Sequence, residues 1–506
     1  MRHCEILDLT LEQLPRAADD LMTALGDAPS AHGRMQFAYA LQRPDGTLQT
    51  RYVMSQGADK PYRLWRVELS ARRLPSLAGK LPLLGWYERE IADLYGIQFD
   101  GHPEPYPLAL HEGFSAGAPP LLKAFDRHGA ALAGHAMPPT EPRMIGAEIQ
   151  RLPFGPVRAD VVESAQFLFY YIGEGILHYH PRLFYKHRAM EARFQGASLL
   201  TGSVLAERVS GVDSVAHALA YSQAVEGALG WRAPRRARAL RVILAELERL
   251  YNHLHYFGHL AKTTTLKVAE AEGLWLDEQV KQVNARLTGS RFLRGLIAPG
   301  GLRRDLDVAG LNEALATIEP AIEVYLARLE GTRSYLDRLQ TTGMLARQVA
   351  FEQGATGPVE RASDLDRDLR RDHVYALYAH LAFEVPVEKG GDAHARALVR
   401  AAEIRQSLAL IRQTLALLAP GPVLRREAVE QADPEGDGLG WVEGTRGGLL
   451  YAVHLDAARA GLARVKIKEP SFSNWRVFPF TVADSNMMDY AINEASFGLS
   501  VAGVDR

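Results

Sequence analysis

Histidines on one predicted helix are the first residues whose spacing could do chemistry. His255 and His259 stand four residues apart, a spacing that lets two imidazoles bind one metal ion. Neither belongs to an HExxH pattern, and histidines without such a partner, here also His253, are more often packing or surface residues. His178 and His180, two residues apart, are interpreted in the same way. We therefore assign no metal ligands to this chain.

A second chemical candidate is the run ERASDLDRDLRRD, which begins at Glu360 and in which acidic and basic residues alternate. Alternating charges are typical of a solvated face, and this is the interpretation we favour. A calcium loop is disfavoured, because the run lacks the central glycine and the terminal glutamate of an EF-hand.

Two polar segments could line a cavity. The segment 207–214, ERVSGVDS, is short and contains a glycine just before a predicted helix that begins near Val215. It is predicted to be a loop in which a Ser or Asp caps the helix. The C-terminal segment SFGLSVAGVDR is too apolar for a free tail, and we expect it to pack against the core.

Composition excludes several classes of protein. The 506 residues suggest two to four domains at roughly 150 residues each. A net charge of -2, from 58 basic and 60 acidic residues, argues against a nucleic-acid partner. The one cysteine, Cys4, excludes an internal disulfide and an iron–sulfur cluster held by four thiolates of this chain.

The sequence offers no segment that would enter a membrane by itself. Glu5, Asp8 and Glu12 interrupt the stretch in which a signal peptide needs apolar residues. The best apolar run, SLALIRQTLALLAPGPVL, is broken by Arg412 and Gln413. Any membrane association is therefore expected to come through partners.

The elements that must position these residues fall into two predicted units. Residues 36–42 and 63–69 are predicted strands, and 86–95 a helix that Gly96 ends. They form a small N-terminal α/β module, residues 1–112. A Gly- and Pro-rich linker, residues 113–146, follows.

Residues 147–506 are predicted to form a large domain. Leu240, Leu244, Leu247, Tyr251 and Leu254 recur at helical spacing, while a polar face carries Arg241, Glu248 and Arg249. Further helices are expected over 274–287, 311–339 and 395–418, and short strands after 449. The predicted fold class is α+β, in which the large domain has a central antiparallel helical bundle and peripheral β elements.

Longer motifs carry a resemblance to known families. Residues 86–103, WYEREIADLYGIQFDGHP, closely resemble the signature of the 30 kDa subunit of respiratory complex I. The rest of the chain is similar to the 49 kDa subunit. It is more similar still to the large subunit of energy-converting nickel–iron hydrogenases of the formate hydrogenlyase type. The motifs that carry this second likeness are GPV from Gly155, YKHR from Tyr185, AELER from Ala245, TGSRFL from Thr288, PGG from Pro299 and KIKEPSF from Lys466.

The resemblance implies a metal site whose ligands are missing. Such hydrogenases bind nickel and iron through four thiolates in RxCGxC and DPCxxC motifs. Here the matching segments are RVSGVD, from Arg208, and GLSVAG, from Gly498, and the four positions are Ser210, Asp213, Ser500 and Gly503. These are hard, weak donors, so the resemblance implies a hydrogenase-related branch without cysteines and without nickel–iron chemistry.

The complex I side of the resemblance is also incomplete. Its quinone-binding Tyr and His fall at Gly211 and near Val162, and the His beside the terminal cluster falls at Leu293. Arg188, however, matches the family arginine that faces that cluster. The resemblance thus implies a 4Fe–4S cluster in a neighbouring small subunit, with Arg188 as its electrostatic partner.

Two hypotheses for the function remain open. In the first, Arg208, Ser210, Asp213 and Ser500 line a cavity between the loop and a C-terminal strand, which takes a quinone-like or other electron acceptor. In the second, the chain is a catalytically silent subunit that bridges an iron–sulfur protein and a membrane arm. Both place the chain on the cytoplasmic face of the inner membrane, in a complex with membrane-arm subunits that uses quinone or NAD.

Overall fold

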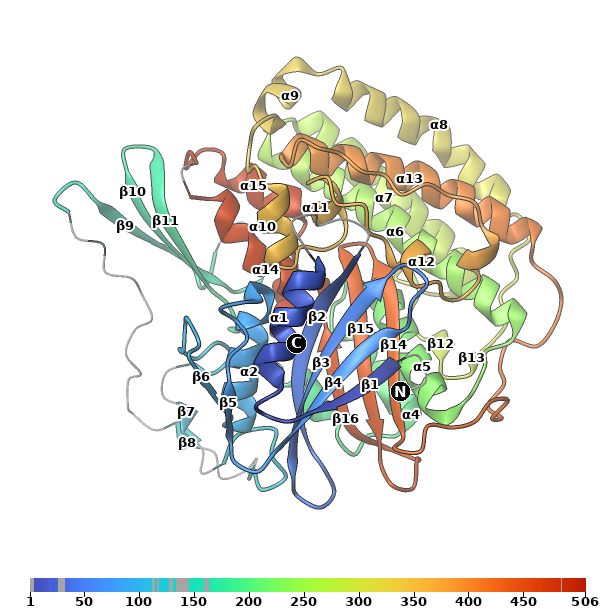
Figure 1. Ribbon diagram of the computed structural model, residues 1–506. Coiled ribbons are helices and arrows are strands. Elements are labelled where there is room, and N and C mark those ends of the chain that lie inside the picture. Colours follow the sequence, from blue (N-terminus) through green and yellow to red (C-terminus); the bar gives the residue numbers. More distant parts are fainter. Residues whose placement is uncertain are drawn as a thin grey trace.

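The computed structural model of the protein describes residues 4–25, 32–111, 114–115, 118–126, 131–132, 144, 146–158, 163–483 and 485–506. The N-terminal module, blue in Figure 1, begins with a strand and a helix and continues as a meander. Its elements are β1 (Cys4–Leu9), α1 (Leu14–Leu25), β2 (His32–Gln42), β3 (Leu48–Gly57), β4 (Tyr62–Leu69), β5 (Arg73–Pro75), η1 (Pro82–Leu84), α2 (Gly85–Tyr95) and β6 (Gln98–Asp100). Two short strands follow, β7 (Phe114–Ser115) and β8 (Ala131–Leu132).

The N-terminal sheet has the order β1-β4-β3-β2, in which β1 is parallel to β4 and the other neighbours are antiparallel. The strands predicted over 36–42 and 63–69 are β2 and β4. The helix predicted over 86–95 is α2, and it ends at Gly96, whose φ of 67° is the left-handed conformation of a helix C-cap.

The large domain begins with a three-stranded sheet, and most of its helices follow. The first elements are β9 (Gln150–Phe154), β10 (Gln166–Ile172), β11 (Gly175–Arg182), α3 (Met190–Phe194), α4 (Leu199–Ala206), α5 (Ser214–Leu229), α6 (Arg235–Thr263), α7 (Lys267–Thr288), β12 (Ile297–Ala298) and β13 (Gly301–Leu302). The next are α8 (Leu311–Glu330), α9 (Arg333–Leu339), α10 (Arg347–Glu352), α11 (Pro358–Arg361), α12 (Leu369–Asp372), η2 (Tyr378–His380) and α13 (Ala393–Ala416). The last are β14 (Asp437–Gly444), β15 (Gly447–Leu455), β16 (Leu462–Lys468), α14 (Pro470–Val477), η3 (Phe478–Thr481), α15 (Tyr490–Phe497) and α16 (Val501–Asp505).

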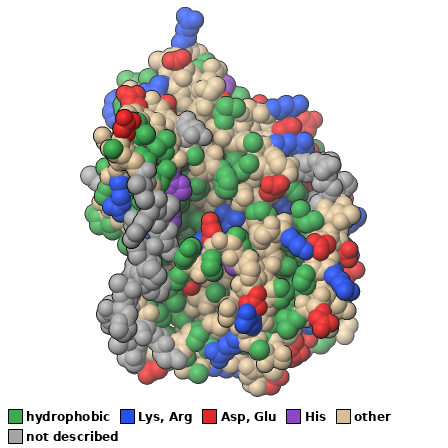
Figure 2. Space-filling view, turned by 60° about the vertical axis from the view of Figure 1, so that its left-hand side comes forward, with side chains coloured by type: hydrophobic (Ala, Val, Ile, Leu, Met, Phe, Trp, Pro, Cys, Tyr) green, Lys and Arg blue, Asp and Glu red, His purple; other side chains and the backbone are tan. Residues whose placement is uncertain are grey.

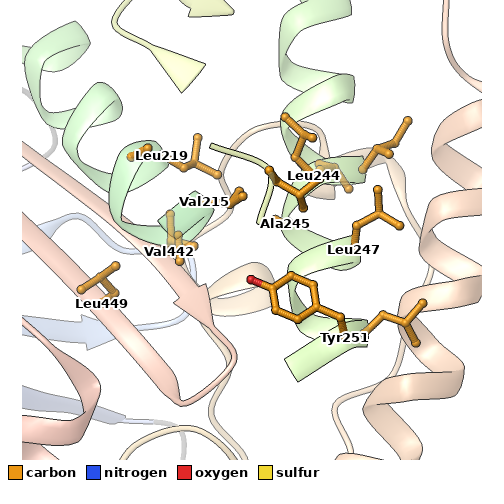
Figure 3. Packing of buried hydrophobic residues seen from close by; sticks show 14 of the residues in the cluster. Val215, Leu219, Leu244, Ala245, Leu247, Tyr251, Val442 and Leu449 are labelled. Atoms are coloured by element: carbon orange, nitrogen blue, oxygen red, sulfur yellow. The ribbon is translucent and has the colours of Figure 1, made fainter. Parts of the chain in front are cut away.

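Four long helices, α6, α7, α8 and α13, lie side by side along one edge of the molecule (Figure 1). Helix α5 separates them from the antiparallel sheet β14–β15–β16. Figure 3 shows this core from close by: Val215 and Leu219 of α5 lie between side chains of α6, such as Leu244, and those of the sheet, such as Val442. The α+β class is therefore confirmed.

The sheet β14–β15–β16 lies in the interior, although we expected the strands of this domain at its periphery. Every residue of β15 is buried. The reason is that α5 covers one face of this sheet, while the N-terminal module covers the other. Tyr87 of α2, for example, lies 4.9 Å between ring centroids from Phe472, just beyond β16. The two units thus share one hydrophobic core.

The predicted polar face of α6 is wrong, because its charges are buried. Arg241 forms an ion pair of 2.5 Å with Glu226 of α5, and Arg249 lies 3.2 Å from Glu246. Glu248 is buried as well. A polar face can enter a core when each charge finds a partner there, and helical periodicity gives no sign of such partners.

The alternating run after Glu360 was also predicted to be a solvated face, and half of it is not. Arg361, Asp368 and Arg370 are completely or almost completely buried, and Arg370 pairs with Asp368 at 2.7 Å. Asp366 and Arg371 are solvated, as predicted. The run splits because α12 directs Arg370 toward Glu246 and Glu403 in the interior, whereas its neighbour Arg371 pairs with the exposed Asp366.

The proposed domain limits, 1–112, 113–146 and 147–506, stay predictions, since most of the linker lies outside the described residues. Within the described part of the chain, no helix has the length and the apolar character that a membrane crossing requires. Acidic and basic side chains are interspersed over the face in Figure 2.

Candidate functional site

The loop 208–213 connects α4 to α5, and Asp213 stands at the N-cap position of α5, but the predicted cap by a Ser or Asp side chain is wrong. Its carboxylate does not cap the helix. Instead Glu248 of α6 accepts hydrogen bonds from the amides of Val215 (2.7 Å) and Ala216 (2.9 Å). The Asp213 carboxylate is therefore left to bind partners outside the helix.

Asp213 binds the turn between β14 and β15. Its Oδ2 accepts a hydrogen bond of 3.0 Å from Nη1 of Arg446, and its Oδ1 accepts one from the hydroxyl of Thr445. Arg446 also donates from Nε to the carbonyl of Gly498, at 2.6 Å. Asp213 is only 2 % exposed, so this pair is an ion pair away from solvent.

Ser500 begins a helix rather than a strand. The C-terminal strand that we expected is helix α16, and Ser500 caps it: Oγ accepts a hydrogen bond of 3.0 Å from the amide of Gly503. The backbone amide of Ser500 donates to Oγ of Ser471. The prediction that this segment packs against the core is confirmed, since Val501 and Val504 are buried.

Arg188 holds the loop and the C-terminal helix together. Its Nη1 donates to the carbonyl of Arg208 (2.9 Å), and its Nη2 donates to the carbonyls of Val209 (2.6 Å) and Ala502 (3.0 Å). Burial lowers the pKa of Arg188. The Arg208 side chain, in contrast, is about half exposed (52 %), 3.7 Å from Glu207.

The structure therefore brings together the residues that the sequence motifs selected. Ser210 is fully buried, and its Oγ has no hydrogen-bond partner among the described residues. We call this region the loop–helix site and define it by Ser210, Asp213, Thr445, Arg446, Glu469, Ser471 and Ser500. Of the other positions that the resemblance selected, Leu293 is buried, Gly211 is exposed and Val162 lies outside the described residues.

Sequence reasoning missed Glu469 and Arg446. Glu469 follows β16 and caps α14, where its carboxylate accepts hydrogen bonds from the amides of Ser471 (2.5 Å) and Phe472 (3.1 Å). Burial, together with the charge of Asp213, raises the pKa of Glu469 to about 8. The dipeptide Glu–Pro was the available signal, because proline is favoured just after an N-cap.

The histidines of α6 have partners in the fold. Nε2 of His253 lies 2.6 Å from Glu403, in the core between α6 and α13, and Nδ1 of His255 lies 3.2 Å from Asp277. No group of three or more His, Cys, Asp or Glu side chains suited to a metal ion is found in the described ranges.

Comparisons with known proteins match both units of this fold. The model of the 30 kDa subunit of respiratory-chain NADH dehydrogenase matches residues 14–131, and that of the 49 kDa subunit matches 275–433 and 427–506. A nickel-dependent hydrogenase model matches residues 188–276, which include the loop and Arg188. The two units and the site thus define a protein of the complex I and hydrogenase class.

Individual relatives narrow this class. Formate hydrogenlyase subunit 5 of Escherichia coli is 30% identical over 461 residues, which are 88% of this chain and 79% of the relative. NADH-quinone oxidoreductase subunit 4 of Thermus thermophilus is 30% identical over 73% of this chain and 97% of the relative. A further NADH-quinone oxidoreductase relative, from Rhodopseudomonas palustris, is 28% identical over 92% of this chain and 88% of the relative. The chain belongs to the family of complex I 49 kDa subunits and formate hydrogenlyase-type large subunits, preceded by a 30 kDa-type domain.

Proposed function

We propose that this chain is a peripheral-arm subunit of a membrane-bound oxidoreductase. In this role it passes electrons from a 4Fe–4S cluster in a small partner subunit to a quinone-like or other acceptor, without a nickel–iron centre. Its relatives are named as subunits of NADH-quinone oxidoreductase and formate hydrogenlyase. We place the chain on the cytoplasmic face of the inner membrane, against membrane-arm subunits, in a complex that uses quinone or NAD.

The donor set of the loop–helix site is the observation that carries this proposal. The four positions that hold thiolates in related hydrogenases are Ser210, Asp213, Ser500 and Gly503. Asp213 is bound to Arg446, and Ser500 caps α16, so neither side chain is available as a ligand. Nickel and the iron carbonyl–cyanide unit need soft donors, and these residues do not fit them.

Arg188 supports the electron-transfer part of the proposal. Its guanidinium group donates to the backbone carbonyl of Arg208, whose exposed side chain lies 3.7 Å from Glu207, so two arginines stand at this edge of the loop. Positive charge next to an anionic cluster of a neighbouring subunit stabilises the reduced cluster. The arrangement therefore suits an electron-input edge.

A second candidate function, a catalytically silent coupling subunit, is favoured by the burial of the site. Ser210, Asp213, Glu469 and Ser500 are each at most 5 % exposed, so the space beside the loop is filled by the chain itself. A silent subunit would keep the scaffold, and the charges inside it would serve only to hold the loop against the C-terminal helix.

The test uses the assembled complex, isolated with its partners. Its metal content is measured first, and then its electron transfer from NADH or reduced ferredoxin to ubiquinone and menaquinone analogues. We expect iron without stoichiometric nickel, together with quinone reduction that Asp213→Asn slows at least tenfold. The control Asp366→Asn changes an exposed acid and leaves the rate unaltered.

Each contrary result has a definite meaning. Nickel at one atom per complex would contradict the ligand argument. Equal rates in the wild type and in Asp213→Asn would exclude the loop–helix site as the place of electron transfer. No quinone reduction by any preparation would leave the silent coupling subunit as the function.

A further inference from the structure

Glu469 carries an inference beyond the loss of the thiolates. It follows the last residue of β16, Lys468, and its carboxyl group is completely buried. Oε2 accepts hydrogen bonds from the amides of Ser471 and Phe472, and Oε1 accepts one of 3.2 Å from the hydroxyl of Ser471. The group is thus held in one position by the start of α14.

That position is next to Gly503, where the hydrogenase motif has its fourth thiolate. A Cβ atom built on Gly503 would lie 2.4 Å from Oε1 and 3.0 Å from Oε2 of Glu469. These contacts are shorter than van der Waals distances. The Glu469 carboxyl group and a side chain at position 503 therefore exclude each other, and an acid fills the volume next to the missing ligand.

The acids around this volume outnumber the cations that are available to them. Arg446 binds Asp213 and the carbonyl of Gly498, and no ion pair joins it to Glu469 within the described ranges. Asp213 also faces Glu248, and burial and that repulsion raise the pKa of Glu248. Asp213 and Glu469 thus share the guanidinium group of Arg446, which pairs with no further carboxylate in the described part of the chain, while the cation that faces Glu248 is Arg249, itself paired with Glu246 and Glu403.

Three further ionisable groups of the described residues interact with Glu469, and none forms an ion pair with it. Tyr87 of α2 and Tyr451 of β15 are buried and neutral, because burial raises the pKa of both. Arg506, at the end of α16, is paired with Glu90 and Glu191. A proton therefore neutralises Glu469 at the lowest cost in free energy in this environment.

Water can approach this strand pair from a polar cavity. A cavity of about 470 Å³ lies between the N-terminal sheet and the large domain, and Thr356, Glu443 and Gly448 are in its lining. Lys468, the neighbour of Glu469, donates to the carbonyl of Gly448 at 3.1 Å. A residue of the cavity lining thus accepts a hydrogen bond from the residue that precedes Glu469 in the chain.

We propose that Glu469 carries the exchangeable proton of the loop–helix site, and that its carboxyl group gains or loses that proton when the charge beside the loop changes by one electron. At and above about pH 8, where part or all of the resting Glu469 is ionised, the carboxylate forms an O–H bond with a proton from water when the partner's iron–sulfur cluster accepts an electron from its upstream donor. Reoxidation breaks the bond and returns the proton to water. The coupling to electron transfer depends on the proposed function. The protonation of Glu469 in the absence of electron transfer does not depend on it.

The resting protonation is tested on the full chain by infrared difference spectroscopy between pH 6 and pH 10. We expect a protonated-carboxyl band that is lost with a midpoint near pH 8 and is absent in Glu469→Gln. The matched control is Glu88→Gln, another buried acid, whose pKa burial raises to about 7; it keeps the pH 8 component. Asp213→Asn removes the repulsion and shifts the midpoint to lower pH.

The redox link is tested on the assembled complex by titrating the midpoint potential of the cluster at several pH values. We expect the potential to become more negative as pH rises, with a slope that Glu469→Gln reduces by at least half and Glu88→Gln leaves unchanged. An identical infrared band in wild type and Glu469→Gln would overturn the proposal, as would an identical slope. A complex that reduces no acceptor, yet keeps the Glu469 band, would refute the proposed function alone.

Discussion

Helix α16 touches two buried clusters of charges that are built in opposite ways. Near its middle, Gly503 meets Glu469 of the loop–helix site. After its end, Arg506 enters a cluster that joins the N-terminal module to the large domain. This interface ion cluster consists of Glu90, Glu191, Arg464, Lys466 and Arg506.

The two clusters differ in how completely their charges are paired. In the interface ion cluster, Glu191 lies 2.7 Å from Arg464, 3.2 Å from Lys466 and 3.1 Å from Arg506. Burial alone would raise the pKa of Glu191. The three cations lower this pKa by a larger amount, so the net shift is downward. The loop–helix site has more acids than cations, and the buried Oγ of Ser210 has no partner among the described residues.

The difference indicates which cluster serves stability and which serves function. A saturated cluster has one stable protonation state and holds two units in one geometry. An unsaturated cluster of buried acids can change its protonation state at small cost, which is common at functional sites. The residues that contact the two clusters, Gly503 and Arg506, are only three positions apart in the sequence.

The largest effect is expected from breaking the saturated cluster. Glu191→Ala leaves three buried cations with Glu90 as their remaining partner, and we expect a loss of about 3–5 kcal/mol in the free energy of unfolding, measured with urea. The control Arg405→Ala breaks an exposed pair with Glu323 and costs less than about 1 kcal/mol. Comparable losses in the two variants would show that the interface ion cluster adds nothing.

A change of opposite sign is expected for the unsaturated cluster. The folded-state pKa of Glu469, about 8, lies above the ordinary value of 4.5, so the native state holds a proton that the unfolded state has lost between these pH values. Its contribution to stability is therefore full below pH 4.5 and is lost as pH rises to 8.

Glu469→Gln cannot ionise and should remove this pH dependence. We expect it to raise the free energy of unfolding at pH 9 by on the order of 3 kcal/mol and to leave it nearly unchanged at pH 5. Urea titrations at the two pH values measure the difference. If Glu469→Gln were less stable than the wild type at pH 9, the ionised Glu469 carboxylate would not destabilise the native state, and the prediction would be wrong.

Whether a feature of the fold or of the site could be predicted depends on how far apart in the sequence the interacting residues lie. The strand β4, the helix α2 and the amphipathic helix α6 follow from local periodicity, and the family motifs selected Arg188, Asp213 and Ser500. The partners of Asp213 did not follow, because Thr445 and Arg446 are more than 230 residues away in sequence. Burial of Arg241 and Arg370 was missed because counter-ions from other helices face them in the core, Glu226 of α5 for Arg241 and Glu246 of α6 for Arg370.

A smaller effect tests the close approach of α16 to Glu469. Gly503→Ala is expected to cost about 1–3 kcal/mol in the wild type, because the new methyl group meets the carboxyl oxygens. In a Glu469→Ala background the same change should cost at least about 1 kcal/mol less. Gly79→Ala, at a glycine with open space around it, provides the control. Additive effects of the two substitutions would mean that the contact is easily relieved.

The smallest expected difference in stability is between Arg188, which binds the loop, and Arg208, which belongs to it. Arg188 donates to three carbonyl oxygens of two segments, so Arg188→Ala should cost about 1–2 kcal/mol, whereas Arg208→Ala, at an exposed side chain, should stay within about 0.5 kcal/mol. Arg188→Lys decides between charge and geometry. Lysine keeps the charge but cannot reproduce the planar fork, so a geometric role predicts that most of the loss remains. If Lys restores full stability, the charge of Arg188 alone holds the loop against α16, and the electron-input edge would need only a cation at this position.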